Sequence, residues 1–218
     1  MMLRFSRVAS ARCTGAVALR APRAQRPFST KALLTILTEE IENEGDVTQM
    51  PEDIVEQLKT LALRGATLEH AAGNGCVKIT LKSGAVASFD CRDVQSDMGE
   101  EEDMEESPMP GTEFEVAVTN LDGHRMIFEC VAAEGVQIDG VSYFRKGADD
   151  KDEDVYDGPK FDELDPRLQQ AFYSYLEDEQ GVDPELVALI NQFAGYKESV
   201  EYAGWLGNIK SFVDVEAK

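Results

Sequence analysis

Carboxylates are the side chains of this sequence that are dense enough to support binding chemistry. They gather in two acidic tracts, whose members are Asp97, Glu100, Glu101, Glu102, Asp103, Glu105 and Glu106 in the first, and Asp149, Asp150, Asp152, Glu153, Asp154 and Asp157 in the second. Because so many like charges cannot share a packed interior, we expect acidic loops at about 97–110 and 149–158. Such loops keep a protein soluble, and they can also attract partners rich in Lys and Arg.

The second tract invites comparison with a calcium-binding loop. Asp150, Asp152 and Asp154 have the spacing of the first three ligands of an EF-hand. However, Val155 stands where that loop requires Gly, and Phe161 stands where it requires a bidentate Glu. The sequence therefore predicts no specific metal site, and a low-affinity buffer for divalent cations such as calcium is an alternative function.

Signatures of an active site are missing from the sequence, which has no phosphate-binding loop, nucleophile elbow or zinc-protease helix. We predict that the two histidines, His70 on a strand and His124 beside a hairpin loop, lie at the surface. Two carboxylates can perform acid–base catalysis, but among 42 acidic residues proximity in sequence singles out no pair. We expect a protein that is not an enzyme and uses no cofactor. The alternative is a hydrolase for which no residue can be named.

The first 31 residues differ sharply from the rest in charge. They contain no Asp or Glu, and their basic residues are Arg4, Arg7, Arg12, Arg20, Arg23, Arg26 and Lys31. Arginines interleaved with Ser, Ala and apolar residues are typical of a mitochondrial transit peptide, whereas a secretory signal needs an uninterrupted apolar run. The stretch Arg26-Pro27-Phe28-Ser29 resembles a matrix processing site, so we predict a transit peptide over 1–28 and one domain over 29–218. A disordered basic arm that binds nucleic acid is the alternative.

The chain after this leader is strongly acidic. Residues 32–218 hold 14 of the 21 basic residues and all 42 acidic ones, a formal charge of −28. Since phosphate contacts require clustered Lys and Arg, we expect no direct binding of nucleic acid. No apolar run approaches the roughly 20 residues of a transmembrane helix. The odd number of cysteines after the leader, Cys76, Cys91 and Cys130, argues against a disulfide framework. Cys76 and Cys91 could still pair across a hairpin, but a three-residue loop at 82–84 would point them to opposite sides of the sheet, so we predict free, partly buried thiols.

Helical periodicity appears near the start and in the last third of the domain. Residues 32–44 predict a short amphipathic helix, while residues 52–63 are equally compatible with a helix and a strand. Asp165-Pro166 and Asp183-Pro184 are typical of helix starts, with Asp as the N-cap and Pro at the first position. The second of these predicts a long final helix whose apolar face covers the sheet or another subunit. Its main apolar residues are Phe193, Tyr196, Tyr202, Trp205, Leu206, Ile209 and Phe212.

Between these helical regions, residues 66–144 show strand alternation. A three-residue loop at residues 82–84 would pair Val77 with Phe89, and one at 121–123 would pair Val116 with Phe128. These registers set apolar residues opposite apolar residues and predict one antiparallel sheet. Residues 136–144 add a further strand, kinked or reversed at Asp139-Gly140.

The C-terminal sequence resembles that of a known family. Residues 176–183 (LEDEQGVD), and Glu201-Tyr202 followed by residues 205–213 (WLGNIKSFV), are similar to the patterns FLxDxGVD and EYxxFLxxLKSFV of the mitochondrial acidic matrix protein family, also called the mitochondrial glycoprotein family. Trp205 stands where the family often has Phe. The order of the expected elements agrees over about 29–213.

This resemblance implies both a fold and a function. The implied fold is α+β, a strongly twisted seven-stranded antiparallel sheet flanked by one N-terminal and two C-terminal helices, in a doughnut-shaped homotrimer. It favours a strand for residues 52–63. The implied function is that of a non-enzymatic adaptor or chaperone of the mitochondrial matrix, which binds basic RNA-processing or ribosomal proteins and supports RNA processing or editing, translation or respiratory-chain maintenance. We expect the two acidic tracts to bind those partners electrostatically.

Overall fold

The computed structural model describes residues 30–45, 47, 49–93, 111–148, 156 and 158–216. The predicted transit peptide and every carboxylate of the two acidic tracts lie outside the described residues. The predictions for those segments therefore remain predictions.

One antiparallel sheet forms the centre of the molecule. Its six strands follow each other in sequence order and are β1 (Thr67–Glu69), β2 (Cys76–Thr80), β3 (Val86–Asp90), β4 (Thr112–Thr119), β5 (Arg125–Ala132) and β6 (Val136–Phe144). Each strand pairs only with its neighbours in the chain, as expected for strands joined by short loops. The predicted α+β class with an antiparallel sheet is confirmed, and the described residues form six strands where the resemblance implied seven.

Both predicted hairpin registers are present. Val77 lies opposite Phe89, and Val116 lies opposite Phe128. Gly84 and Gly123 close the two loops with φ of 89° and 83°, a left-handed conformation that costs glycine little. In these registers the three described cysteines are free, as predicted.

Strand β6 contains the predicted kink and does not reverse. Glu129 of β5 lies opposite Gly140, and Cys130 lies opposite Ile138, so Asp139 is an extra residue without a partner in the ladder. This β-bulge bends the strand locally and directs the Asp139 side chain away from the regular alternation.

Residues 52–63 form a helix, so the strand that the family resemblance favoured is wrong. Helix α1 (Thr30–Glu44) is followed by α2 (Glu52–Leu63), whose Ile54 and Leu61 are both buried. Residues seven apart lie on one face of a helix but on opposite faces of a strand. The helix therefore buries both side chains together, which a strand could not do against a single layer.

The C-terminal third begins with a short 3-10 helix, η1 (Phe161–Glu163), and continues with α3 (Pro166–Ser174), the π-helix η2 (Tyr175–Gln180) and α4 (Pro184–Glu216). Both predicted N-caps are confirmed. Asp165 accepts a hydrogen bond from the Arg167 amide at 2.9 Å, and Asp183 accepts one from the Leu186 amide at 2.9 Å. Left-handed Gly181, with φ of 82°, ends η2 and allows the chain to turn into α4.

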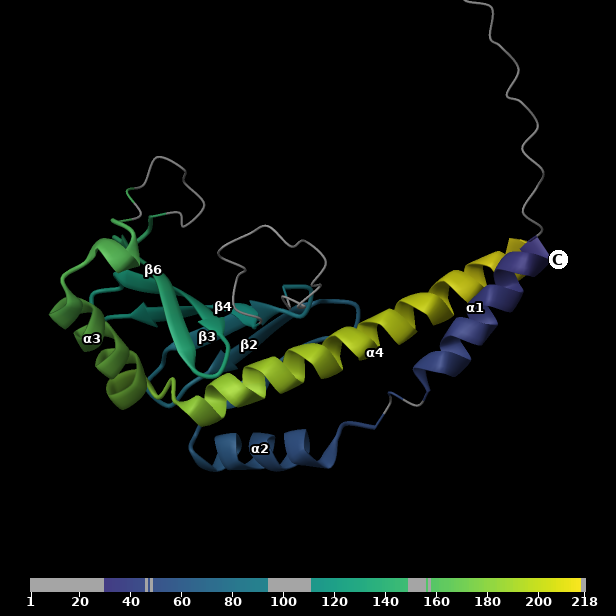
Figure 1. Cartoon of the computed structure of the whole chain (residues 1–218), viewed down its shortest axis with the longest axis horizontal. Coiled ribbons are helices and arrows are strands. Elements are labelled where there is room, and N and C mark those ends of the chain that lie inside the picture. Colours follow the sequence, from purple (N-terminus) through teal and green to yellow (C-terminus); the bar gives the residue numbers. More distant parts are fainter. Residues whose placement is uncertain are drawn as a thin grey trace, which may run out of the picture.

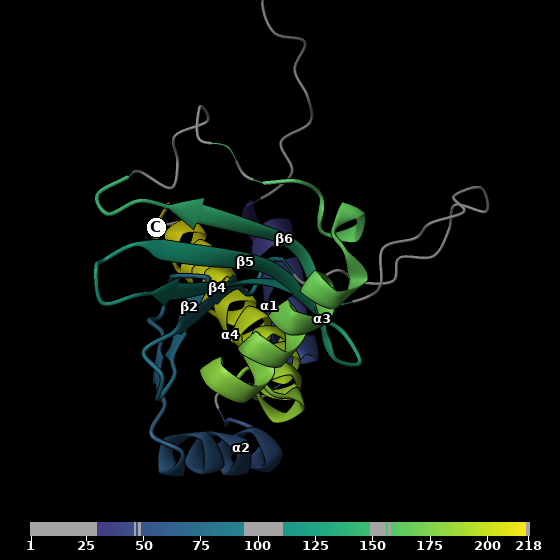
Figure 2. The ribbon, with the colours of Figure 1, turned by 90° about the vertical axis from the view of Figure 1, so that its left-hand side faces the viewer.

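The helices cover one face of the sheet. Phe128 of β5 packs its ring against Phe172 of α3 and Tyr175 of η2, while Leu189 and Phe193 of α4 are buried in the same core. Beyond the sheet, α4 continues as an arm beside which α1 lies antiparallel (Figure 1). Viewed along α4, the strands lie on one side of that helix and α2 lies on the other (Figure 2). Within the described part of the chain, no helix is long and apolar enough to span a membrane.

Candidate functional site

The face of the sheet that points away from the apolar core carries a groove of about 420 Å³. We call it the sheet groove. Its lining includes two acidic residues from the end of β3, two from β4 and one each from β5 and β6, which are Asp90, Asp93, Glu113, Glu115, Glu129 and Asp139. Cys76, Ser88, Phe89, Phe114 and Cys130 complete the lining. Among the described residues that line the groove there is no Lys or Arg.

Strand pairing brings these carboxylates together. Glu113 and Glu115 are exposed and flank buried Phe114, so both point to the face opposite the core. Glu115 lies directly opposite Glu129 on β5. Like charges in this cross-strand position repel each other and destabilise a sheet. The groove therefore has a negative potential that attracts cations.

The bulge in β6 completes this cluster. Asp139, the extra residue, contributes its side chain to the groove. Its neighbour Gly140 faces Glu129, and a Cβ at this position would lie 2.8 Å from Glu129 Oε2. Any larger residue at Gly140 would thus displace the Glu129 carboxylate, so the glycine leaves room for an acidic side chain.

Asp90 is held by a neighbouring arginine. Arg92 donates from Nε to Asp90 Oδ1 at 2.8 Å and from Nη2 to Oδ2 at 2.7 Å. These hydrogen bonds hold the pKa of Asp90 below its usual value, against the opposing effect of burial. A Cβ at Gly75 would lie 2.4 Å from Asp90 Oδ1, so this glycine allows the carboxylate its position. Asp90 is therefore ionised throughout the neutral pH range.

Two thiols at or near the groove, those of Cys130 and Cys91, are poor nucleophiles. Burial raises the pKa of Cys130 far above its usual value, and the carboxylates of Asp139 and Glu129 raise it further. Burial also raises the pKa of Cys91. No three His, Cys, Asp or Glu residues among those described are grouped so that they could hold a metal ion. The arrangement can attract cationic groups through its field, without a covalent step.

His70 lies at the surface, as predicted, whereas His124 is only partly exposed. His70 is exposed just after β1, with its ring edge-on to Phe193 at 5.3 Å between centroids. His124 is half-buried at the β4–β5 loop, where its Nδ1 is hydrogen-bonded to the Tyr143 hydroxyl at 2.6 Å. Neither lines the sheet groove.

The predicted apolar face of α4 is divided between core and surface. Phe193 is 0% exposed and Leu206 is 3% exposed, while Trp205 is 56% exposed and Phe212 is 64% exposed. Three further residues of this set, Tyr196, Tyr202 and Ile209, are half-buried. The hydroxyl of Tyr202 donates to Glu40 Oε1 of α1 at 3.1 Å, which fixes part of the arm.

The sheet groove was not predicted from the sequence, because only continuous runs of acidic residues were considered as binding sites. Glu115, Glu129 and Asp139 stand on three different strands, each beside apolar residues. The signal was nevertheless available, since the predicted pairing of Val116 with Phe128 requires that Glu115 face Glu129. Asp93, the last described residue before the first acidic tract, also lines the groove.

Two curated proteins with mitochondrial names are similar to part of the chain. An uncharacterised mitochondrial protein of Arabidopsis thaliana is 32% identical over 100 residues, which are 45% of this chain and 40% of that protein. The mitochondrial acidic protein mam33 of Schizosaccharomyces pombe is 37% identical over 99 residues, 40% of this chain and 36% of that protein. The match thus spans about two fifths of either relative, and both names support a mitochondrial location for this chain.

Solved structures of two further proteins share the fold. One is a Leishmania major protein of unknown function described as a sequence homologue of human p32, with a TM-score of 0.65 and 20% identity over 85% of this chain and 99% of that one. The other is the p22 protein of Trypanosoma brucei, with a TM-score of 0.61 and 22% identity over 85% and 98% of the two chains. Residues 37–213 match the model of the mitochondrial glycoprotein family, MAM33, and the chain therefore belongs to that family.

Proposed function

We propose that this protein is a non-enzymatic acidic adaptor of the mitochondrial matrix that binds Lys- and Arg-rich proteins electrostatically. The observation that carries this proposal is the sheet groove, whose described lining holds six acidic residues and no basic one, although Arg92 beside the groove is paired with Asp90. Through these partners, such as RNA-processing or ribosomal proteins, the adaptor would support RNA processing or editing, translation or respiratory-chain maintenance. The two acidic tracts, which lie outside the described residues, are proposed to bind the same basic partners.

The physical basis is the concentration of negative potential in a concave surface. A cleft with low-dielectric walls and charges of one sign focuses the field and raises the association rate of oppositely charged partners by about 10- to 1,000-fold. A Lys or Arg side chain that approaches Glu115 and Glu129, which lie opposite each other on β4 and β5, would be attracted by both carboxylates. Because salt at about 0.15 M screens charges over roughly 8 Å, binding should weaken as salt is added.

We also propose that the protein assembles as the doughnut-shaped homotrimer that the family resemblance implies. Four large apolar side chains on the arm support this assembly: Leu33 and Ile36 of α1, and Trp205 and Phe212 of α4, which are all at least 41% exposed. Large apolar side chains that α1 and α4 leave exposed can contribute to a protein interface. A second copy of the chain could cover them and place several sheet grooves on one particle.

The binding proposal is tested by neutralising the cross-strand pair. We expect Glu115→Gln combined with Glu129→Gln to weaken binding of a ten-residue oligolysine peptide about two- to twentyfold, the effect of two partly exposed ion pairs. The measurement is isothermal titration calorimetry at two salt concentrations. The matched control is Glu69→Gln combined with Glu134→Gln, which removes two exposed carboxylates outside the groove. Equal weakening in both variants would show that the sheet groove is not the site where oligolysine binds. Absence of oligolysine binding to the unaltered protein would refute the adaptor function.

Physiological partners require a second experiment. The mature protein should recover basic proteins from a mitochondrial lysate, and this recovery should survive ribonuclease and decline as salt is raised. Loss of every partner after ribonuclease treatment would mean that RNA bridges the contacts. That outcome would contradict a direct electrostatic interaction between proteins.

A further inference from the structure

A second cavity lies between α2 and the start of α4, far from the carboxylates of the sheet groove in the fold. It has a volume of about 540 Å³, which is within the usual range for ligand pockets. Leu61 of α2 and Leu186 and Leu189 of α4 form its apolar lining, and all three are buried. We call this cavity the helix pocket. It exists because residues 52–63 form a helix and do not add a strand to the sheet.

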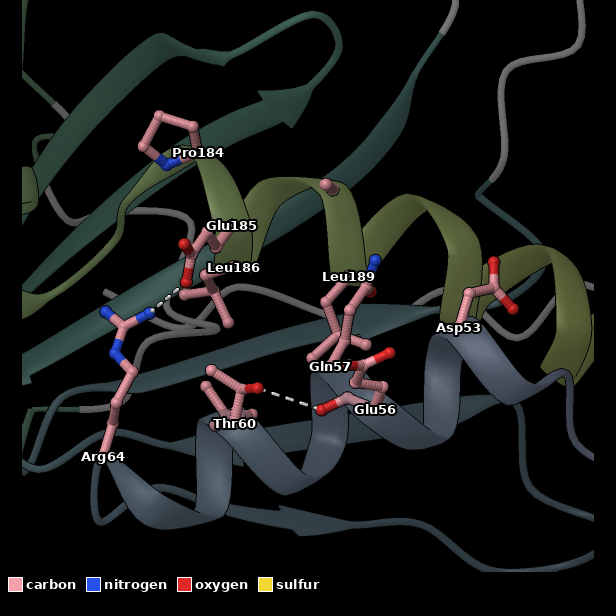
Figure 3. Close-up of a pocket in the computed structure, with 11 residues that line it drawn as sticks. Asp53, Glu56, Gln57, Thr60, Arg64, Pro184, Glu185, Leu186 and Leu189 are labelled. Atoms are coloured by element: carbon pink, nitrogen blue, oxygen red, sulfur yellow. Dashed lines mark hydrogen bonds and ion pairs between the residues drawn. The ribbon is translucent and has the colours of Figure 1, made fainter.

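Acidic and polar side chains surround the apolar part of the helix pocket. Figure 3 shows Asp53, Glu56 and Gln57 on α2 facing α4, and Arg64 reaching Glu185 from the other end of α2. Arg64 Nη1 donates to Glu185 Oε2 at 3.2 Å, and its Nη2 is paired with Asp183. The single basic residue that lines this pocket is thus already engaged by two carboxylates.

The opposite end of the pocket has negative charge without a partner. Within the described part of the chain, no cation forms an ion pair with Asp53 or Glu56. Near them, the side-chain oxygen Oε1 of Gln57 is buried and accepts no hydrogen bond from any described group. A buried acceptor without a donor costs about 1–3 kcal/mol. A cationic ligand at this end would reduce the negative charge, and a rotation of the Gln57 side chain toward the cavity would let Oε1 accept a hydrogen bond from it.

We propose that the helix pocket receives a Lys or Arg side chain of the basic partner. This inference rests on the proposed function, because it identifies a place where the adaptor holds one residue of that partner. The aliphatic part of a Lys or Arg side chain would pack on the exposed apolar residues of the lining, Pro184 and Ala188, since Leu186 and Leu189 are each only 1% exposed. Its charged end would lie beside Glu56 and donate to Gln57. The pocket therefore selects a long cationic side chain over a short or an uncharged one.

The probe is the tripeptide N-acetyl-Gly-Lys-Gly-amide, added to the full mature protein and followed by NMR. We expect the methyl signals of Leu186 and Leu189 and the side-chain amide of Gln57 to shift saturably. The same tripeptide with norleucine in place of lysine keeps the aliphatic stem without the charge, and it should bind at least several-fold more weakly. Equal binding of the two tripeptides would contradict the role assigned to the acidic end.

Two substitutions separate the pocket from diffuse attraction. Glu56→Gln should weaken lysine-peptide binding about two- to fivefold, as expected for a partly exposed ion pair. Its matched control is Glu52→Gln. Glu52 carries the same charge and lies one helical turn before Glu56 on α2, but its side chain does not line the pocket. Gln57→Leu should weaken binding about two- to tenfold through the lost hydrogen bond, while the protein becomes no less stable because an unpaired buried acceptor has been removed.

The outcomes distinguish failure of this inference from failure of the proposed function. If Glu52→Gln weakens binding as much as Glu56→Gln, attraction is diffuse, and the helix pocket is refuted while the adaptor function stands. If dilution alone moves the Gln57 and Leu189 signals, a second copy of the chain occupies the pocket and the inference is wrong. If neither the lysine tripeptide nor oligolysine binds anywhere, the adaptor function and the inference fail together.

Discussion

The two halves of α4 have similar apolar content and very different surroundings. In the first half, Leu186, Leu189, Ile190 and Phe193 are at most 1% exposed because the sheet and α2 lie against this part of the helix. The second half runs beyond the sheet and packs beside α1 alone (Figure 1). One helix covers only one side of another, so large side chains on the remaining sides stay in contact with solvent. Burial of an apolar helix face is thus decided by what lies opposite it.

The largest effect on stability should come from the first half of α4. Phe193→Ala removes a ring that packs edge-on against His70 and against Tyr196 at 6.0 Å between centroids. We expect the free energy of unfolding to fall by about 3–5 kcal/mol, the usual cost of truncating a buried Phe. Denaturant titration measures this loss. A change below about 1 kcal/mol would mean that the core contact is not formed in solution.

An intermediate effect is expected where the two halves meet. Lys197 is 2% exposed, and its Nζ donates to the Ala71 carbonyl at 2.7 Å and is paired with Glu201. Glu201 also accepts a hydrogen bond from the Gly73 amide at 2.8 Å, which ties α4 to the β1–β2 loop. Because Glu201→Gln leaves the buried ammonium with a weaker acceptor, it should cost about 1–3 kcal/mol of unfolding free energy. Glu198→Gln, at an exposed neighbouring position, is the matched control. An equal loss of unfolding free energy in both variants would contradict a specific role of Glu201 in joining α4 to the β1–β2 loop.

The same pair predicts a dependence of stability on pH. The hydrogen bond from Lys197 holds the pKa of Glu201 below its usual value. A carboxylate with a lowered folded-state pKa contributes stability above its unfolded pKa of about 4.3, and this contribution disappears as pH falls through the folded-state value. The difference in stability between the unaltered protein and Glu201→Gln should therefore be complete at pH 7 and shrink below about pH 4.3. A difference that persists at pH 2 would assign the effect to packing.

The smallest effect on unfolding of the chain itself should come from the second half of α4. Trp205 and Phe212 are mostly exposed, so replacing either with Ser should change the stability of a single chain by about 0.5 kcal/mol or less. If the arm forms the trimer interface, however, these variants should sediment as smaller species at micromolar concentration. Leu63→Ser is the control, because Leu63 is 90% exposed at the end of α2, away from the arm. Unchanged sedimentation of the arm variants would place the interface elsewhere.

Several features of the fold were predicted because short-range rules govern them. The pairing of Val77 with Phe89 and of Val116 with Phe128 follows from loop length and from the alternation of apolar residues. The helix starts at Asp165 and Asp183 follow from capping, since each side chain satisfies an amide only two or three residues away. The helix at residues 52–63 was also within reach, because the spacing of Ile54 and Leu61 suits a helix better than a strand.

The candidate sites were predicted less well. Acidic residues were expected to act in the two tracts, yet the described structure gathers another set from four strands, among them Glu115, Glu129 and Asp139. The helix pocket had no sequence signal, since its two sides are more than 100 residues apart in the chain and meet only when α2 packs against α4. Sites of this kind depend on contacts between distant segments.

By itself, the sequence determined the class of the protein, the hairpin registers, the helix starts and the strongly acidic character of the chain, because each depends on composition or on residues close together. Only the tertiary structure decided which half of α4 is buried, where the strand carboxylates meet and how α2 encloses a pocket. Those features depend on which surfaces face each other, and packing sets this at sequence separations where periodicity and spacing carry no information.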